Sequence, residues 1–538
     1  MSGVIPLLIL TYVPELKHFY TIEPVGLETE DGIYISAYKY TPRGEKNHGG
    51  IIVTHSFFGS KLNMQPLSIE LVKRGFTVLN IDFRGHGASG GFFYRNQVNR
   101  DIKAAVDYFK SNIPYVTDLG LVGHSLGAQS VLGFSRIYPT LINATVAIGG
   151  GINNFTGISN VLVATGLYDP SLPEETLIDY LELYTGIENL KVGQVYFGDF
   201  NNGTNIKTYV SPLSGHLTEI VDFNIIYQTI QWFEQAFNGE YGSGIVITAP
   251  LLIIFSYISL FGVIMLDAVL IIYIRNYIFR KEKEDSNKEI FEELRLVSTK
   301  KLVGFYSIAV VFIQYLFFLY IFDISVDIIP LSTTSITLTL VVGAAVGTFL
   351  VYNLLLLGWK DKYSIKDLFS QLKTMSSFSP RRSLIFGALI GILSILSIGA
   401  VWHWSVQNTL PTISEIGKMV ILTVLSFPFF LIKEFYFRSI QQRIITTYRY
   451  EEYFIMVGTG LFMDNLLIIF VILVGKLNLA YIPTYTLYLL VWFIFSIIQQ
   501  FTTTWVYMNS KNILGSTIFM SIFYSWMLVV FFPSYGFL

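Results

Sequence analysis

Residues 123–127 read Gly-His-Ser-Leu-Gly and place Ser125 at the centre of a Gly-x-Ser-x-Gly pattern. The pentad follows a short apolar run, 119–122, and precedes a helical stretch, 128–137. A strand, a tight turn and a helix in this order lift the central serine out of the backbone as an exposed nucleophile. The spacing therefore predicts that Ser125 attacks a carbonyl carbon and forms a covalent acyl intermediate.

Short strands and helices alternate around this pentad. A β-hairpin is expected over 20–40, apolar strands over 50–54 and 77–81, and helices over 64–74 and 99–112. Buried strands that alternate with helices imply a mostly parallel sheet that is covered on both faces. The fold class expected for this half is therefore α/β.

Two further motifs precede the pentad in the chain. Strand 50–54 leads into residues 55–59, His-Ser-Phe-Phe-Gly, and strand 77–81 ends in residues 82–90, Asp-Phe-Arg-Gly-His-Gly-Ala-Ser-Gly. Together with the pentad, and in this order, they resemble the α/β-hydrolase superfamily, most of all its lysophospholipase, monoacylglycerol lipase and serine aminopeptidase-like branch. The resemblance covers about residues 20 to 237. It implies a serine hydrolase that needs neither a metal nor an organic cofactor.

The resemblance also implies an acid and a base for Ser125, in the chain order serine, acid, histidine. Asp169 lies in the loop after the expected strand 160–165, which matches the family's acid; its alternative role is that of a turn residue before a proline. His216 follows the expected strand 206–210 and precedes the final helix, which matches the family's base. Asp169 is thus expected to orient His216, and His216 to shuttle the proton of Ser125.

Three other histidines lie within or beside these motifs. His55 and His86 belong to the two loop motifs, where they are expected to hold the loops together. His124 is next to the serine, and its side chain is expected to point away at the turn.

Two backbone N–H groups are expected to stabilise the oxyanion of the tetrahedral intermediate. By analogy with the family they belong to Leu126, directly after the nucleophile, and to Phe57, in the turn after strand 50–54. The family usually has His-Gly before this turn, whereas this chain has His55-Ser56. The departure leaves the geometry of the oxyanion hole open without removing either donor.

The connection after strand 144–148 is unusually short. Only about ten residues separate it from the next strand, which begins at Asn160, whereas a parallel crossover normally takes a dozen or more. Family members usually place a helix there, often with a cap domain, so this chain is expected to have a tight crossover and no cap. Further on, 194–209 is expected to contain an extra hairpin around Asn201-Asn202-Gly203.

Composition divides the chain into two unlike parts. Of 538 residues, 52% are hydrophobic and 14% are charged, well below the roughly 25% charged residues of soluble proteins. The expected domains are an N-terminal apolar segment at 1–19, an α/β-hydrolase domain at 20–240 and a polytopic transmembrane helical domain at 245–538. The net charge of −2 argues against nucleic acid as a partner, and the absence of cysteine excludes disulfides and thiolate metal sites.

The second half contains eight apolar runs long enough to cross a bilayer, which takes about 20 residues each. They are 246–274, 302–322, 336–358, 384–406, 418–437, 453–475, 482–506 and 513–533.

Basic residues are distributed unevenly between these runs. The connections 275–301, 360–382, 433–449 and 509–512 carry eight, six, four and one Lys or Arg, while 323–335, 407–418 and 475–481 carry none, one and one. By the positive-inside rule the first set faces the cytoplasm. The hydrolase half precedes the first span, on the side opposite to connection 275–301, so it is expected to be extracytoplasmic, with the protein in the plasma membrane. Because the number of spans is even, the C-terminus is expected on the same side as the hydrolase half.

Two observations bear on this topology. Asn143, Asn154 and Asn202 each begin an Asn-X-Ser/Thr sequon, so they are candidate N-glycosylation sites of an exported domain, although Asn143 is expected to begin a buried strand. The apolar run 4–13 lacks the preceding positive charge of a secretory signal. Translocation through the first span, an atypical signal, and an inverted topology with a cytoplasmic hydrolase all stay open.

Several ionisable residues lie in or near the apolar runs, and such groups usually face the bundle interior and pair with one another. The candidate polar cluster consists of Asp267, Glu434, Arg438 and Asp464. His403 is a further ionisable residue in these runs. Glu434 and Arg438, four residues apart, also resemble the Glu-x-x-x-Arg element of the CAAX-protease-like (CPBP) intramembrane family. That family has two adjacent glutamates where this chain has Lys433-Glu434, and its later histidines have no counterpart here, so any such domain has lost its metal chemistry.

The sequence as a whole predicts a membrane-integrated serine hydrolase without cofactor that cleaves an ester of a lipid or small acyl group, or an amide bond. Its partners are an acyl ester, lipid or peptide substrate and membrane lipids. The alternative is a membrane protein of binding, assembly or transport function in which the hydrolase domain is accessory or inactive. Eight spans are more than an anchor requires, and fold alone does not fix the substrate.

Overall fold

The computed structural model describes two main parts of the chain. The first is residues 19–280, apart from 58, 92, 152–154, 156, 187, 198 and 241; the second comprises 379–405, 413–441, 447–475 and 482–531, with a few isolated residues beside them. The chain folds into two compact units, one formed mainly by the residues up to Phe261 and the other by most of the rest.

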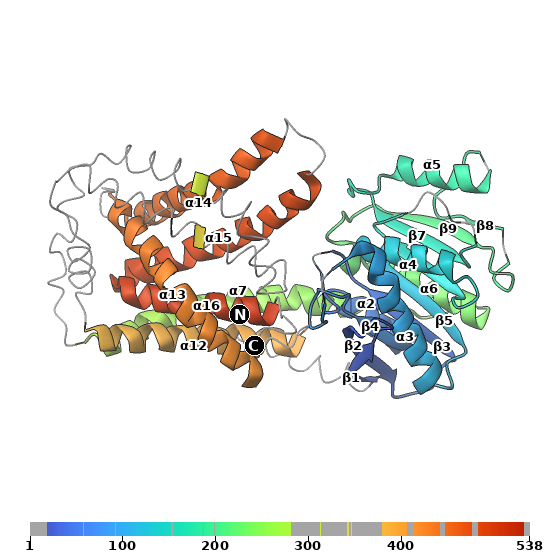
Figure 1. Cartoon of the computed structure of the whole chain (residues 1–538), viewed down its shortest axis with the longest axis horizontal. Helices are drawn as coiled ribbons and strands as arrows, with labels where there is room; N and C mark the ends of the chain where they lie inside the picture. Colours follow the sequence, from blue (N-terminus) through green and yellow to red (C-terminus); the bar gives the residue numbers. More distant parts are fainter. Residues whose placement is uncertain are drawn as a thin grey trace. The chain divides into compact units, whose positions relative to one another are not determined.

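The first unit is built on a nine-stranded sheet (Figure 1) in the order β1-β2-β4-β3-β5-β6-β7-β9-β8. The strands are β1 (Tyr20–Glu28), β2 (Tyr34–Pro42), β3 (Gly49–Thr54), β4 (Thr77–Ile81), β5 (Asp118–His124), β6 (Ala144–Ile148), β7 (Val161–Gly166), β8 (Val195–Tyr196) and β9 (Ile206–Ser211). The six strands from β4 to β9 in this order are parallel to their neighbours, whereas β1, β2 and β8 join antiparallel at the edges. The mostly parallel α/β sheet that the sequence predicts is confirmed.

Helices connect these strands and cover both faces of the sheet. They are α2 (Gln65–Lys73), α3 (Val98–Asn112), α4 (Leu126–Ile137), α5 (Glu174–Thr185) and α6 (Phe223–Asn238), with short turns η1 (Arg95–Gln97) and η2 (Glu219–Val221). Along β3, Ile51 and Val53 enter a core cluster with α2 and α6, while Ile52 enters a second cluster with α3 and α4. Successive strand residues point to opposite faces, so the apolar runs that predicted these strands are buried on both faces of the sheet.

The connection from β6 to β7 is as tight as its length indicates. The two strands pair in parallel, and the residues described between them form no helix. The expected extra hairpin is also present, because β8 pairs antiparallel with β9. Both features therefore lie next to the ends of β6, β7 and β9.

The first long apolar helix, α7 (Ala249–Ile278), begins in contact with α2 of the first unit. Glu70 of α2 is buried, and its Oε1 accepts hydrogen bonds from the backbone N–H groups of Thr248 (2.8 Å) and Ala249 (2.5 Å). A carboxylate at this position satisfies N–H groups that a helix start leaves without partners. Ala249 itself belongs to the core cluster of α2 and α6.

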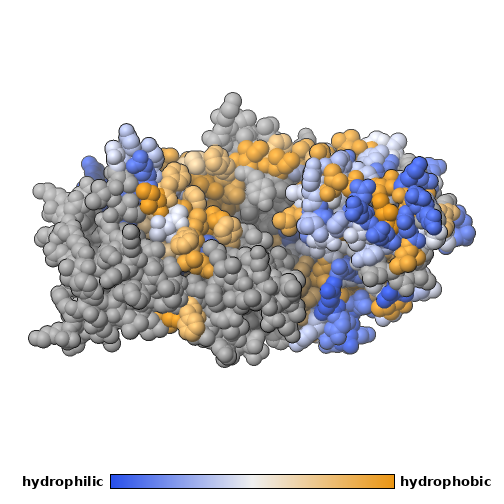
Figure 2. All heavy atoms as spheres, turned by 90° about the horizontal axis from the view of Figure 1, so that it is seen from above, coloured by the Kyte–Doolittle hydropathy of each residue, from blue (hydrophilic) through white to orange (hydrophobic). Residues whose placement is uncertain are grey.

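The remaining described helices are long and apolar. They are α12 (Pro380–Ser405), α13 (Ile413–Gln441), α14 (Arg449–Gly475), α15 (Ile482–Ser510) and α16 (Ile513–Trp526), followed by a π-helical turn, η5 (Met527–Phe531). Among the described residues, four stretches are long and apolar enough to cross a membrane: Ala249–Ile278, Pro380–Val401, Glu415–Arg438 and Ile513–Val530. In Figure 2 the coloured surface of the first unit is largely hydrophilic, while hydrophobic residues prevail on the coloured surface of these helices.

The count of eight spans stays a prediction. Helices α14 and α15 coincide with the expected runs 453–475 and 482–506. The runs 302–322 and 336–358 lie almost wholly outside the described residues.

Two of the basic residues expected in a connection lie within a helix. Helix α13 continues to Gln441, so Lys433 and Arg438 lie inside it, where both are fully buried. They are two of the four basic residues counted in connection 433–449. Buried basic residues paired within a bundle do not report on the facing compartment as loop residues do. The positive-inside argument therefore rests mainly on connections 275–301 and 360–382.

Candidate active site

Ser125 sits at a sharp turn between β5 and α4. Its φ of 57° and ψ of −110° are a combination that a residue with a side chain rarely adopts. The glycines on either side are required by close packing. A Cβ on Gly123 would lie 2.3 Å from the carbonyl carbon of Gly127, and a Cβ on Gly127 would lie 2.7 Å from the carbonyl oxygen of Thr54. The Gly-x-Ser-x-Gly pattern is thus the sequence that allows this turn to close.

The three residues predicted as nucleophile, acid and base meet at the carboxyl ends of the parallel strands. His216 Nε2 lies 2.9 Å from Ser125 Oγ, and His216 Nδ1 lies 2.9 Å from Asp169 Oδ2. Each residue follows a different strand: Ser125 follows β5, Asp169 follows β7 and His216 follows β9. The sheet order places β5, β6, β7 and β9 side by side, so the loops after these strands converge.

Protonation at this site follows from its contacts. The hydrogen bond with Asp169 raises the pKa of His216 above its ordinary value, against the opposing effect of burial, and the charges of Asp169 and Glu219 add to the rise. Burial alone would raise the pKa of Asp169, but its hydrogen bonds with His216 and with the Ser171 N–H hold that pKa below the ordinary value. Asp169 is therefore the anion to which Nδ1–H donates, and Nε2 faces the Ser125 hydroxyl as a hydrogen-bond acceptor.

The two expected oxyanion donors, Leu126 and Phe57, follow different strands. Leu126 begins α4, and the first N–H groups of a helix have no partner within it. Phe57 is held through its carbonyl oxygen, which accepts a hydrogen bond from His86 Nε2 at 2.5 Å. The buried His55 accepts a bond from the Phe83 N–H at 3.0 Å, and burial lowers the pKa of His55 to about 3. His55 and His86 are thus neutral loop-holding residues, in agreement with the sequence.

A buried carboxylate, Asp82, joins the loop after residues 55–59 to the motif at 82–90. Its oxygens accept bonds from the Lys61 backbone N–H (2.6 Å), from the Lys61 ammonium group and from the Ala88 N–H (2.9 Å). Burial alone would raise the pKa of Asp82, but the ion pair with Lys61 holds it below the ordinary value. A Cβ on Gly87 would lie 2.2 Å from this carboxylate. Gly87 therefore lets the chain wrap around Asp82.

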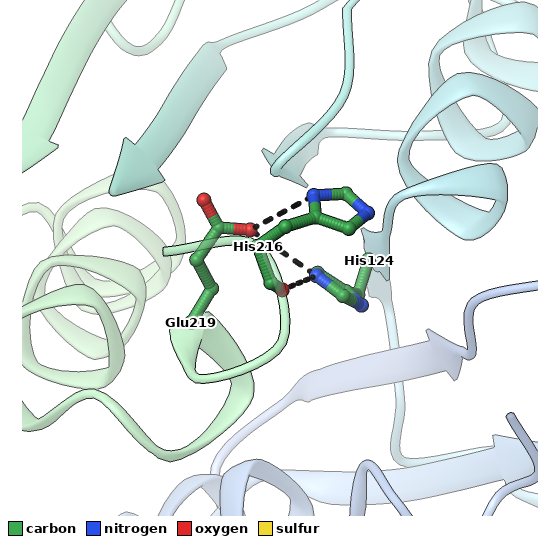
Figure 3. Close-up of side chains that lie close together, drawn as sticks. All are labelled: His124, His216 and Glu219. Atoms are coloured by element: carbon green, nitrogen blue, oxygen red, sulfur yellow. Dashed lines mark hydrogen bonds and ion pairs between the residues drawn. The ribbon is translucent and has the colours of Figure 1, made fainter. Parts of the chain in front are cut away.

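Sequence reasoning missed one residue of this site, Glu219. Its side chain is fully buried, accepts a bond from the Gly166 N–H at 2.6 Å, and lies 3.1 Å from His124 Nε2 and 3.8 Å from His216 Nδ1 (Figure 3). Its spacing of three residues from His216 was the available signal.

The expectation for His124 was wrong. Its ring does not point away from the site: the ring centre lies 4.9 Å from that of His216, and Nε2 lies 2.9 Å from the His216 carbonyl oxygen. The reason is that the loop carrying His216 folds over the ends of β6 and β7, and it brings Glu219 to His124 there.

His124, His216 and Glu219 also have the side-chain types that bind metals, with ligand atoms within 4.8 Å of one another. Those atoms already engage other groups of the site. His124 Nε2 donates to acceptor oxygens, and His216 Nδ1 donates to Asp169. These three residues therefore form a hydrogen-bonded network with one another and with Asp169.

The candidate polar cluster of the helical bundle is brought together only in part. Arg438 forms an ion pair with Glu434, with nitrogen–oxygen distances of 2.9 to 3.1 Å, as the spacing of four predicts. Asp464 instead pairs with the buried Lys433 at 3.0 Å. Asp267 accepts a bond from Ser397 at 2.6 Å, and no described contact joins it to the other three. The place of Asp267 in the cluster stays a prediction, and the side chain of His403 lies outside the described residues.

The three sequons differ in their setting. Asn202 lies exposed in the turn between β8 and β9. Asn143 does not begin a buried strand: it is exposed just before β6, and its Oδ1 accepts a bond from the Leu119 N–H at 2.9 Å. Asn154 lies outside the described residues. Glycosylation at any of them stays a prediction.

Residues 45–166 match the family described as serine aminopeptidase, S33. A monoacylglycerol lipase of Mycolicibacterium smegmatis is 28% identical over 140 residues, which are 24% of this chain and 49% of that protein. A probable alcohol acetyltransferase of Cyberlindnera jadinii is 32% identical over 105 residues, 19% of this chain and 29% of that protein. The chain thus spans about half or less of the length of these curated relatives.

Solved structures are also similar to part of this chain. An esterase of Pyrococcus furiosus is 19% identical, with a TM-score of 0.34 over 42% of this chain and 95% of that one. An α/β serine hydrolase without lid from Xanthomonas campestris is 17% identical, with a TM-score of 0.32 over 41% and 96%. The family match and the order of strands in the sheet together identify the N-terminal half of this chain as an α/β-hydrolase domain.

Proposed function

We propose that this chain is a membrane-integrated serine hydrolase that cleaves an ester bond. The observation that carries the proposal is the continuous hydrogen-bond path from Ser125 Oγ through His216 to Asp169, with both distances at 2.9 Å. A binding scaffold has no need for this path, whereas nucleophilic catalysis depends on it.

The reaction follows from this geometry. Ser125 Oγ attacks the substrate carbonyl carbon while His216 Nε2 takes the hydroxyl proton, and the carbonyl oxygen becomes an oxyanion held by the N–H groups of Phe57 and Leu126. The bond to the leaving alcohol breaks as His216 returns the proton to it. Water then attacks the acyl-enzyme by the same route, which releases the acid and restores Ser125.

Asp169 supports both half-reactions from its buried position. As an anion it fixes the Nδ1–H tautomer of His216 and stabilises the imidazolium that forms when Nε2 takes the proton. The hydrogen bond that raises the pKa of His216 makes it the stronger base. The same effect sets the lower pH limit of activity, because a protonated His216 accepts no proton.

An ester with an apolar acyl group is the substrate class that we propose. The loops after β7 and β9 expose Leu167, Tyr168, Leu213 and Leu217 close to Asp169 and His216, and Leu213 is 82% exposed. Large exposed apolar side chains grouped at a site favour an apolar ligand. No helix covers the site among the residues described between β6 and β7, and one relative is named a monoacylglycerol lipase.

The membrane part of the proposal rests on the apolar helices and on the basic connections. We propose that the bundle spans the plasma membrane and that the hydrolase domain is extracytoplasmic. Protease added outside intact cells then cleaves within residues 20–240 and spares connection 275–301. Protection of the hydrolase domain, with cleavage only after the cells are opened, would show the inverted topology.

Full-length protein in lipid nanodiscs, offered a panel of substrates, tests the activity. We expect hydrolysis of long- and short-chain acyl esters and monoacylglycerols, weak or no cleavage of peptide amides, and no turnover by Ser125→Ala. Turnover of peptides alone would refute the ester assignment. Equal turnover by the wild type and Ser125→Ala would refute the nucleophile.

A further inference from the structure

Glu219 connects the three loops of the proposed site. It lies in η2, three residues after His216, and its Oε1 accepts bonds from the Gly166 N–H (2.6 Å) and the Thr165 hydroxyl (3.2 Å). Its Oε2 lies 3.1 Å from His124 Nε2. His124 directly precedes the nucleophile, and Gly166 ends the strand that leads to Asp169.

His124 links Glu219 to the main chain of His216. Its Nε2 lies 2.9 Å from the His216 carbonyl oxygen as well as 3.1 Å from Glu219. Both neighbours are acceptors, so Nε2 carries the proton and donates to them. The main chain at His216 is therefore bonded to the residue beside Ser125, and Glu219 holds the donor that makes this bond.

The fold leaves room for this carboxylate. Gly149, at the end of β6, has φ +59°, and a Cβ there would lie 2.0 Å from Glu219 Oε2 and 3.2 Å from His216 Nδ1. Any side chain at this position would displace Glu219 as well as strain the backbone. The glycine that starts the tight crossover to β7 is thus also the space in which Glu219 sits.

Glu219 also acts on His216 through its charge. Its Oε2 lies 3.8 Å from His216 Nδ1, and its side chain has no exposure to solvent. Charges interact more strongly in the interior than in water because the local dielectric constant is lower. In the described part of the chain, the titratable groups in contact with His216 are Asp169, Glu219 and His124.

We propose that Glu219 is a positioning residue for His216, which sets the placement of the base through His124 and provides a second negative charge for its imidazolium. The inference rests on the proposed function, because it assigns a role to Glu219 in the same reaction. It assigns no contact between Glu219 and the substrate.

The rate at which a fluorophosphonate probe labels the full-length protein, measured against pH, tests this role. Glu219→Gln keeps the shape of the side chain, but an amide offers one acceptor oxygen where Glu219 uses two. We expect labelling about tenfold slower or more at neutral pH, the size of effect that follows from losing a charged hydrogen bond. The acidic limb of the profile moves to lower pH, because one of the two charges that raise the pKa of His216 is gone.

Glu234→Gln is the matched control. Glu234 is also a buried glutamate of this domain, and it pairs with Arg74 at 2.6 Å and accepts from the Gly242 N–H at 2.9 Å. It takes no part in the site, so its loss affects folding alone. We expect the labelling rate per folded molecule and the acidic limb to match the wild type.

A second variant separates positioning from general damage. His124→Leu removes the donor to Glu219 and His216 but leaves the charge of Glu219 less neutralised. Labelling slows as in Glu219→Gln, yet the acidic limb moves to higher pH. This variant also serves if Glu219→Gln does not fold.

The possible results are distinguishable. In the first case the probe labels the wild type, Glu234→Gln and Glu219→Gln at the same rate and with the same acidic limb. The role of Glu219 is then refuted and the proposed function stands. If both site variants slow labelling with an unmoved limb, Glu219 is merely structural and the inference fails. A folded wild type without labelling refutes the proposed function, and the role of Glu219 with it.

Discussion

Replacing the proposed nucleophile by glycine should stabilise the hydrolase domain while abolishing its chemistry. Ser125 holds φ 57° and ψ −110° because the turn between β5 and α4 imposes them. Such a conformation costs about 1–3 kcal/mol for a residue with a Cβ, and glycine avoids that cost. Glycine also gives the unfolded chain more freedom, which offsets about 0.4–1 kcal/mol.

The comparison that isolates this strain is Ser125→Gly against Ser125→Ala. Both variants lose the 2.9 Å hydrogen bond to His216, so its contribution cancels. The difference in the free energy of unfolding is then about 0.5–2 kcal/mol in favour of glycine. Ser130 in α4 provides the control, because its hydroxyl bonds the Leu126 carbonyl oxygen inside a regular helix. There glycine should be less stable than alanine by about 1 kcal/mol.

Pulse proteolysis of the full-length protein across a urea series measures both pairs, with cleavage followed inside the hydrolase domain. We expect the urea midpoint of Ser125→Gly to exceed that of Ser125→Ala, and the order to reverse at Ser130. A Ser125→Gly midpoint equal to or below that of Ser125→Ala would refute the claim that the turn is strained.

Three further outcomes follow from the same contacts. Gly127→Ala places a Cβ against the backbone of β3 and should destabilise the hydrolase domain by about 1–3 kcal/mol in the same proteolysis assay. Gly133→Ala is the control, because its Cβ meets open space and should not destabilise the domain. Asp169→Asn removes the hydrogen bond that raises the pKa of the base; the acidic limb of fluorophosphonate labelling should move to lower pH and the rate fall about 10²- to 10⁴-fold. An unmoved limb would contradict the pairing. Lys433→Met leaves Asp464 buried without its ion pair and should lower the free energy of unfolding by about 3–5 kcal/mol, measured as earlier thermal unfolding in detergent. Adding Asp464→Leu should recover most of this loss. A double variant as unstable as the single one would refute the importance of the ion pair.

Those parts of the site that depend on local chain geometry were predictable from the sequence. The turn at Ser125 needs glycine on both sides, and the chain carries them at the required positions. Asp169 and His216 were assigned from the resemblance to the α/β-hydrolase superfamily, and the strands before them were apolar enough to be recognised. Parallel strands align their carboxyl ends, which brings the loops after them together. The tight crossover after β6 was visible as a simple count of residues.

The contacts between loops were not predictable in this way. Glu219 appeared as an ordinary charged residue before a helix, and only the fold over β6 and β7 brings it to His124. Likewise, Lys433 and Arg438 were counted as loop charges because hydropathy averages over a window. Their burial depends on partners in helices distant in the chain, such as Asp464 for Lys433. Pairing of this kind is a tertiary property, and it decides where a charge can lie.

The identity of the nucleophile is the claim on which the account depends most. Labelling of isolated membranes with a fluorophosphonate probe, followed by mass spectrometry of the modified peptide, tests it directly. We expect a single adduct on Ser125 in the wild type, and none with Ser125→Ala or His216→Ala. A folded wild type that takes up no probe, or an adduct on another residue that persists in Ser125→Ala, would contradict it.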